Sequence, residues 1–303
     1  MYFSIVKNAK IFFSITIIFL LIGIGSMFTR GFNLGIDFTG GTIMDLEFTN
    51  PASINQVREV LKEHDLGNSV IQLGTSDATA SESKSVLIRT GVISDDERRV
   101  VMEDMKSKVG DYSVLRVEQV GATVGNELVQ QAVIAIVLSW VLMIIYITIR
   151  FEFKFAIAAI IALIIDVLVT LSWFSLAKME MDSSFVAALL TVVGYSVNGT
   201  IVVFDRIREN LKRHRRSESL GDMVDNSIWQ TMARSLYTVA TSLVAVIAIF
   251  LFGGETIHNF SFAMMVGFGS GAYTSTLLAG PMWSFFKEHS EPQGKIQSKT
   301  KVV

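Results

Sequence analysis

The sequence predicts an α-helical membrane protein with six transmembrane helices and one extracytoplasmic α+β domain between the first and second helices. Two observations lead to this class. Hydrophobic residues make up 50% of the 303 residues, charged residues make up only 18%, and the mean hydropathy is +0.48. The apolar residues also gather into runs of membrane-spanning length instead of being spread along the chain at a helical period.

The first apolar run extends from Ile11 to Phe28 and follows Lys7 and Lys10. No small-residue cleavage pattern precedes Arg30, so we expect a retained helix rather than a signal peptide that is removed. Five more runs come after a long polar stretch. They cover residues 128–149, 155–177, 183–204, 235–252 and 260–286.

Basic residues predict the orientation of these helices. If the N-terminus is cytoplasmic, the short outer loops contain only Lys178. The positive-inside rule then places both termini in the cytoplasm and residues 31–127 outside it. Residues 1–30 form the N-terminus and first helix, residues 128–286 the other helices, and residues 287–303 a cytoplasmic tail.

The cytoplasmic side is basic although the net charge of the chain is -2. Residues 205–232 are expected to form a cytoplasmic loop. Its basic cluster is suited to contact the head groups of the lipid bilayer rather than nucleic acid.

Residues 31–127 show short strand and helix patterns, and Ser53 is a suitable helix N-cap. The predicted strands are residues 42–48, 69–74, 85–89 and 113–120, the predicted helices are 53–64 and 95–109, and a polar turn covers 75–83. The order β-α-β-β-α-β is that of a ferredoxin-like domain, in which two helices cover one face of a four-stranded antiparallel sheet. The other face is free to meet a partner.

This domain lacks the groups that an enzyme needs. The chain has no cysteine, which excludes a disulfide and a thiolate metal site. His64 stands alone, and the acidic residues 95–97 suit the N-terminus of a helix. The glycine pair 40–41 is expected in a turn rather than in a phosphate-binding loop. We therefore expect no enzymatic activity, no cofactor and no metal.

Asp166 interrupts the third apolar run. An ionisable side chain at the centre of a transmembrane helix costs roughly 2.5 to 3.5 kcal/mol on insertion scales. Two interpretations stay open: Asp166 joins two helices through hydrogen bonds, or it carries protons.

Arg234 lies at the start of the fifth run, and Thr238 follows one turn later on the same face. The two side chains can present a pair of donors to a neighbouring helix. The alternative is an Arg whose side chain extends to the cytoplasmic interface.

The fourth run carries Asn198, Gly199 and Thr200 midway. Polar groups at this depth either pair with neighbouring helices or line a route for an ion or solute. The cytoplasmic end of this helix holds Asp205, Arg206, Arg208 and Glu209. Two interpretations stay open: these charges continue the helix face that carries Asn198, or they are a solvated helix end without a function. In the sixth run, small residues between 267 and 272 permit close approach of helices.

Three motifs together resemble the SecD/SecF family of protein-export membrane proteins, within the resistance-nodulation-division superfamily. They are Gly35-Ile-Asp-Phe-Thr-Gly-Gly-Thr42, the Val193-Gly-Tyr-Ser-Val-Asn stretch with Asp205-Arg-Ile-Arg-Glu-Asn210, and Leu251-Phe-Gly-Gly254. The resemblance covers nearly the whole chain, including the helix plan and the large loop after the first helix.

The resemblance implies a subunit in the bacterial cytoplasmic membrane that pairs with SecD and associates with the SecYEG channel. YajC and YidC are further implied partners. Such a subunit uses the proton motive force to help draw unfolded exported polypeptide outward. The Asp of an Asn-Asp-Thr triplet in the fourth helix and an Arg in the fifth take part in proton conduction in this family.

The chain departs from the family pattern at two places. Gly199 stands where the triplet has Asp, whereas Arg234 and Thr238 match. A His-Asp pair of the third helix is Ile165-Asp166 here. Three accounts remain open: Asp166 or a SecD carboxylate carries protons, the subunit is an uncoupled structural partner of SecD, or Gly199 is an engineered inactivation.

A small-molecule exporter of the same superfamily is a rival function. Such exporters usually carry two six-helix halves and two large outer loops, whereas this sequence predicts one of each. The sequence therefore favours the export subunit.

Overall fold

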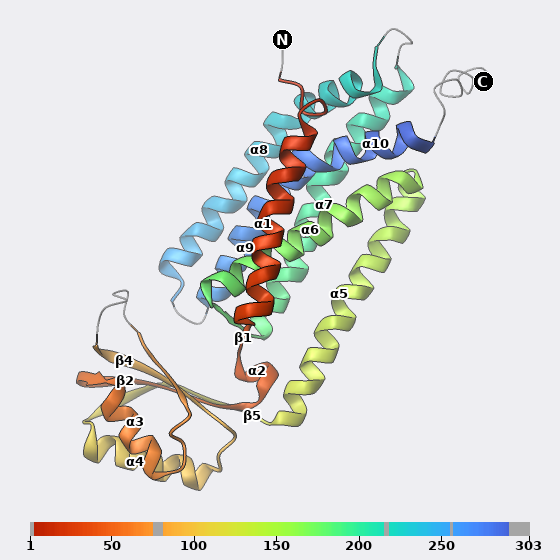
Figure 1. Ribbon diagram of the computed structural model, residues 1–303. Coiled ribbons are helices and arrows are strands. Elements are labelled where there is room, and N and C mark those ends of the chain that lie inside the picture. Colours follow the sequence, from red (N-terminus) through yellow and green to blue (C-terminus); the bar gives the residue numbers. More distant parts are fainter. Residues whose placement is uncertain (1–2, 75–80, 215–217, 255–256, 291–303) are drawn as a thin grey trace. The chain divides into compact units, whose positions relative to one another are not determined.

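The computed structural model describes residues 3–74, 81–214, 218–254 and 257–290 (Figure 1). The chain forms two compact units. The sheet unit contains residues 34–132, and the helical unit contains residues 1–33 and 133–303. The predicted turn at 75–83 falls largely on residues 75–80, which lie outside the described residues, as do residues 291–303 of the predicted tail.

The sheet unit is built from four strands and two longer helices. Its elements are α2 (Ile36–Thr39), β2 (Gly41–Ser53), α3 (Ile54–Glu63), β3 (Val70–Leu73), β4 (Glu82–Thr90), α4 (Asp95–Lys108) and β5 (Tyr112–Val120). The sheet has the order β3-β4-β2-β5, and each neighbouring pair is antiparallel. Every strand and helix predicted here overlaps an element of the predicted type, and the short α2 was not expected.

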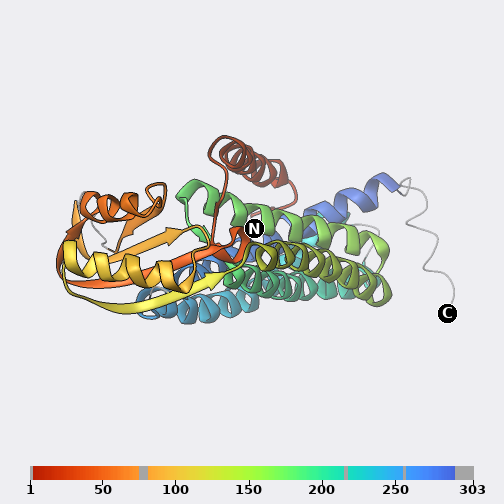
Figure 2. The same cartoon turned by 90° about the horizontal axis from the view of Figure 1, so that it is seen from below.

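The core of the sheet unit lies between the sheet and its two helices, which cover one face (Figures 1 and 2). Leu46 of β2 and Val86 of β4 are fully buried against Val57 of α3 and Met105 of α4. Ser53 and Ser94 begin α3 and α4 as N-caps with a reciprocal capping box. The predicted N-cap at Ser53 is therefore confirmed.

The glycine pair 40–41 joins α2 to β2. Gly40 has a φ of 70° and Gly41 a φ of 139°, and a Cβ atom at Gly41 would lie 2.5 Å from the Thr90 carbonyl oxygen. Only glycine fits this junction without displacing β4.

Within the part of the chain that the structure describes, five helices are long and apolar enough to span a membrane. They are α1 (Ala9–Arg30), α5 (Ala122–Arg150), α6 (Phe153–Ala177), α7 (Ser183–Lys212) and α8 (Leu220–Phe252). The short strands β1 (Asn33–Leu34) and β6 (Glu180–Met181) follow α1 and α6 in the chain.

The sixth predicted run is not one uniform α-helix. It comprises α9 (His258–Tyr273), the π-helical segment η2 (Thr274–Leu278) and α10 (Ala279–Ser290). Thr274 and Ser275 occupy the start of η2, where the wider turn interrupts the α-helical bonding.

Within the segment 205–232, which was expected to form a loop, residues 205–212 belong to α7 and residues 220–232 to α8. The Ser219 side chain caps α8 by accepting a hydrogen bond from the Asp222 N–H. Apolar residues of the first turns of α8, such as Val224 and Ile228, are fully buried in the core of the helical unit. The segment is amphipathic, and its many polar residues hide the helical spacing of its apolar ones. The helix therefore begins at Leu220, before the apolar run predicted from residue 235.

Leu46→Ala should destabilise the sheet unit by roughly 2 to 5 kcal/mol, because it removes a fully buried side chain from a packed core. Pulse proteolysis of the full chain in urea measures the free energy of unfolding. Val114→Ala is the matched control, since Val114 is 48% exposed. Equal losses in the two variants would contradict the core described here.

The capping box of α4 should make its first turn sensitive to acid. Hydrogen bonds from the Ser94 backbone N–H and then its hydroxyl lower the pKa of Glu97 from 4.5. The carboxylate therefore stabilises the folded state above pH 4.5, and this contribution is lost as the pH falls through the lowered value. Hydrogen exchange at the start of α4 should accelerate over that range, and Glu97→Gln should remove the pH dependence of the exchange.

Candidate functional site

Asp166 is a buried, well-connected polar group among the described residues of the helical unit. It lies on α6 with 1% of its surface exposed. Ser196 of α7 donates to Oδ2 at 2.5 Å, and Ser270 of α9 donates to Oδ1 at 2.6 Å. Thr274 of η2 lies 3.0 Å from each carboxyl oxygen. One side chain thus joins α6 to three other segments.

Small residues allow α9 to lie close to α7 at this level. A Cβ atom at Gly267 would lie 2.2 Å from Val192, and one at Gly271 would lie 3.1 Å from Ser196. A larger residue at either position would separate the helices and move Ser270 away from Asp166. The small residues expected to permit close packing therefore also bring the donors to the carboxyl group.

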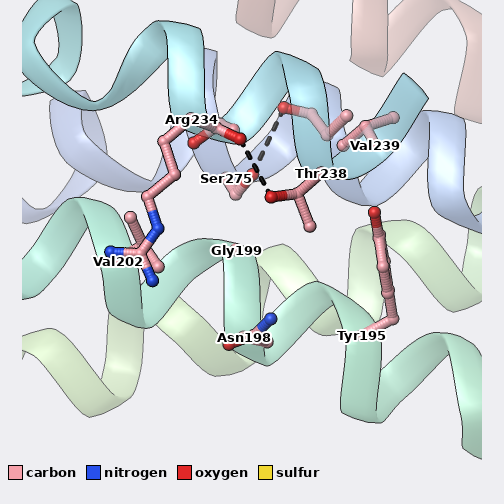
Figure 3. A pocket seen from close by; sticks show the side chains of 10 residues that line it. Tyr195, Asn198, Gly199, Val202, Arg234, Thr238, Val239 and Ser275 are labelled. Atoms are coloured by element: carbon pink, nitrogen blue, oxygen red, sulfur yellow. Dashed lines mark hydrogen bonds between the residues drawn. The ribbon is translucent and has the colours of Figure 1, made fainter. Parts of the chain in front are cut away.

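A second set of polar side chains, together with several apolar ones, lines a cavity of about 50 Å³ between α7, α8 and the α9–η2 segment (Figure 3). The lining residues are Tyr195, Asn198, Gly199 and Val202 of α7, Arg234, Ser235, Thr238 and Val239 of α8, Ala272 of α9 and Ser275 of η2. The structure therefore brings together four of the predicted site residues: Asn198, Gly199, Arg234 and Thr238.

Arg234 and Thr238 lie one turn apart on α8, as expected, and both side chains are exposed. The Thr238 hydroxyl donates to the Arg234 carbonyl oxygen at 2.9 Å. Within the described part of the chain, the Arg234 guanidinium makes no hydrogen bond or ion pair. Thr200 is buried on α7 and is not among the lining residues.

Gly199 faces Ser275 across the cavity. A Cβ atom at Gly199 would lie 3.1 Å from the Ser275 hydroxyl oxygen and 3.4 Å from its Cβ. A larger side chain fits here if Ser275 moves by a few tenths of an ångström. An Asp at this position would enter the cavity that Arg234 lines.

Asp166 and Arg234 do not share one site. Asp166 is enclosed by its hydroxyl partners, and Arg234 lines the separate cavity. Thr274 and Ser275 are consecutive residues of η2. Thr274 bonds to Asp166, and Ser275 lies beside Gly199 at the cavity. The hydroxyl partners of Asp166 were missed from sequence, because nothing in the spacing of Ser196, Ser270 and Thr274 distinguishes them from other small polar residues.

The charged end of α7 makes local contacts. Arg206 donates to Glu209 at 2.5 Å and to Gln230 at 2.6 Å. Arg208 donates to the Arg150 carbonyl oxygen at 3.2 Å, while Asp205 is exposed. These contacts fasten α7 to α8 and α5, and they do not reach the cavity. Among the described residues, no group of three or more His, Cys, Asp or Glu side chains is arranged so that it could hold a metal ion.

Asp166→Leu should destabilise the helical unit by about 3 kcal/mol or more, since it removes the acceptor of the Ser196 and Ser270 hydroxyls and leaves Thr274 only a longer bond to a backbone carbonyl oxygen. Asp166→Asn should cost far less, because the amide can exchange hydrogen bonds with the same hydroxyls. Unfolding of the full chain in mixed detergent measures the difference. Ser172→Ala is the control, as Ser172 donates only within α6. A small loss for Asp166→Leu would contradict this network.

The chain is similar in sequence to known protein-export membrane proteins. The family profile described as "Protein export membrane protein SecD/SecF, C-terminal" matches residues 100–289, and the profile "SecD/SecF GG Motif" matches residues 25–52. The protein translocase subunit SecF of Acidaminococcus fermentans is 71% identical over 94% of this chain and 98% of its own. The SecF of Haemophilus influenzae is 39% identical over 90% of this chain and 82% of its own.

Solved structures agree with these relatives. The crystal structure of SecDF from Thermus thermophilus, described as a translocon-associated membrane protein, has a TM-score of 0.85 at 31% identity. The match covers 95% of this chain and 39% of the SecDF chain. A further SecDF structure, in the super-membrane-facing form, has a TM-score of 0.71 at 32% identity over 97% of this chain. The chain therefore belongs to the SecD/SecF family of protein-export membrane proteins and, within it, to the SecF translocase subunits.

Proposed function

We propose that this chain acts with SecD at the SecYEG channel to promote the late, proton-motive-force-dependent export of unfolded polypeptides. YajC and YidC are additional partners in this proposal. Asp166 takes up and releases the proton, and the resulting change in helix packing moves the sheet unit against exported chain.

The proposal gives the chain six spans in the bacterial cytoplasmic membrane, with both termini in the cytoplasm. The sheet unit then lies on the opposite side as a ferredoxin-like domain. Its strand order, β3-β4-β2-β5, and its two helices on one face support that assignment. The basic residues near the ends of α7 and α8 support the orientation.

The single observation that carries the proposal is the position of Asp166. Its carboxyl group accepts hydrogen bonds from α7, α9 and η2 at once. Protonation changes which oxygen accepts and which donates, so it alters contacts among four segments together. A charge that crosses the membrane potential supplies about 2.3 kcal/mol per 100 mV, which is comparable to several such hydrogen bonds.

Replacing Asp166 by Asn and Arg234 by Gln together tests the proposal. In proteoliposomes that contain SecD, SecYEG and this chain, gradient-stimulated export should fall to the rate seen without a proton gradient. Ser172→Ala should retain the stimulation, since its hydroxyl bonds only within α6. Full stimulation in the double variant would refute proton coupling through this chain.

One observation favours a second candidate, in which the chain is a structural partner of SecD without proton coupling of its own. Gly199 brings no carboxylate to the cavity that Arg234 lines. Gly199→Asp asks, in the same assay, whether a coupling group is missing at this position. Faster gradient-driven export in this variant would show that a coupling group is missing here, and an unchanged rate would leave the structural role standing.

The full-length relatives favour both candidates over a small-molecule exporter. The matched relatives are named as translocase subunits, and two of them cover 94% and 90% of this chain.

A further inference from the structure

A groove between α1, α6 and α9 is lined mainly by apolar side chains. Its volume is about 550 Å³, within the range of roughly 300 to 1,000 Å³ that is typical of sites for small organic ligands. All but three of the lining residues are apolar, and they include Ile15 of α1, Val169 and Trp173 of α6 and Phe262 of α9. Ile15 is 54% exposed and Trp173 is 43% exposed, so the groove reaches the surface of the helical unit.

The three hydroxyl groups of the lining already donate hydrogen bonds to the protein. Thr16 donates to the Phe12 carbonyl oxygen at 3.0 Å, and the Tyr273 hydroxyl donates to the same oxygen at 2.8 Å. Ser270 donates to Asp166 at 2.6 Å. An apolar ligand therefore leaves none of these hydroxyl donors unsatisfied, whereas an ordered water needs two to four polar partners. The lining favours a hydrocarbon over water.

The groove lies at the level of the membrane-spanning segments. Phe19 and Ile165 line it from the middle of α1 and of α6, and both helices are long and apolar enough to span a membrane. A partner helix does not fit, because a single turn of a helix about 10 Å wide already occupies roughly 400 Å³. An acyl chain is thinner, and a bilayer provides such chains at this depth. A Cβ atom at Gly269 of α9 would meet nothing within 4 Å, so α9 leaves room for the chain.

Two basic residues lie together at one end of the helices that form the groove. Lys178 lies about 7.5 Å beyond Trp173 along the axis of α6. Its ammonium group donates to the carbonyl oxygen of Arg30, the last residue of α1. Arg30 is exposed, and its guanidinium makes no hydrogen bond or ion pair within the described residues. A phosphate group at these two cations would bring an attached acyl chain to Trp173, at the nearer end of the groove.

We propose that the groove binds an acyl chain of one membrane phospholipid, whose phosphate group lies at Arg30 and Lys178. The apolar lining with its satisfied hydroxyls suits the chain, and the two cations suit the phosphate. The bound chain covers Ser270 and so separates its hydrogen bond to Asp166 from the bilayer. The site depends on the location of the chain in a membrane, and it depends neither on proton transfer nor on the proposed export function.

Quenching of tryptophan fluorescence by a brominated lipid tests the proposal. Phosphatidylglycerol with dibrominated acyl chains is titrated into the purified full chain in detergent micelles. The Trp173 signal is the difference in emission between the chain and a Trp173→Phe variant, because the chain has four tryptophans. This signal should fall and saturate at one lipid per chain. A decrease that stays linear in the ratio of lipid to detergent would overturn the proposal, since it reports only partitioning into the micelle.

Filling the groove localises the binding. Gly269→Phe should abolish the saturable quenching, because its ring occupies the space of the chain. Gly194→Phe is the matched control and should retain it: a Cβ atom at Gly194 of α7 also meets nothing within 4 Å, and Gly194 does not line the groove. Val169→Phe adds bulk from α6 and should raise the lipid concentration at half-saturation several-fold, which keeps the test decisive if Gly269→Phe does not fold. Unchanged saturation in either folded groove variant would refute the site.

The phosphate group is tested separately. Arg30→Gln should raise the lipid concentration at half-saturation several-fold. Arg213→Gln should leave it unchanged, because Arg213 is 81% exposed and pairs with Glu209 at the C-terminal end of α7. A dibrominated diacylglycerol, which has the same chains without a phosphate group, should bind several-fold more weakly than the phospholipid. Equal binding of the two probes, or unchanged binding in Arg30→Gln, would overturn the assignment to a phospholipid.

Discussion

The helical unit depends on the hydrogen bonds that enclose Asp166. An unpaired carboxyl group at this depth would be expelled or would distort the helices, because neither water nor lipid can replace its partners. Ser196, Ser270 and Thr274 provide those partners from three segments other than α6. The packing of α6, α7 and α9 is thus specified by one polar group as well as by apolar contacts. Glycine at 267 and 271 is a consequence, since the helices must be close enough for hydroxyls to reach.

The contrast between the two polar groups of the helical unit has a physical cause. Asp166 is surrounded by hydroxyl donors, whereas Arg234 lines a cavity beside the Tyr195 and Ser235 hydroxyls, which make no hydrogen bond within the described residues. Among the residues that the structure describes, the first arrangement is satisfied and the second is not.

Helices and strands could be predicted from the sequence where apolar runs or alternating patterns mark them. Runs of apolar residues gave α1, α6 and α7 to within a few residues at most ends, and alternation with capping residues gave the strands and helices of the sheet unit. The start of α8 was missed because Met223, Val224 and Ile228 are spaced by helical periodicity among charged residues. The π-helical turn at Thr274 was missed because its cause is tertiary: no local residue type demands it. Asp166 and Arg234 could be selected as unusual groups in apolar runs, but their partners depend on which helix faces meet.

The η2 segment explains how two separate polar groups can respond to one another. Thr274 bonds to Asp166, and its neighbour Ser275 faces Gly199. Because the two residues share a turn, a displacement of Thr274 on loss of its acceptor moves Ser275 as well. A π-helical turn is less constrained than the α-helix on either side, so it can absorb such a shift without moving all of α9 and α10. Coupling between the carboxyl group and the cavity therefore needs no direct contact between Asp166 and Arg234. It needs only that this turn have two arrangements of similar free energy, and Thr274 already has a second acceptor in the Gly271 carbonyl oxygen at 3.3 Å.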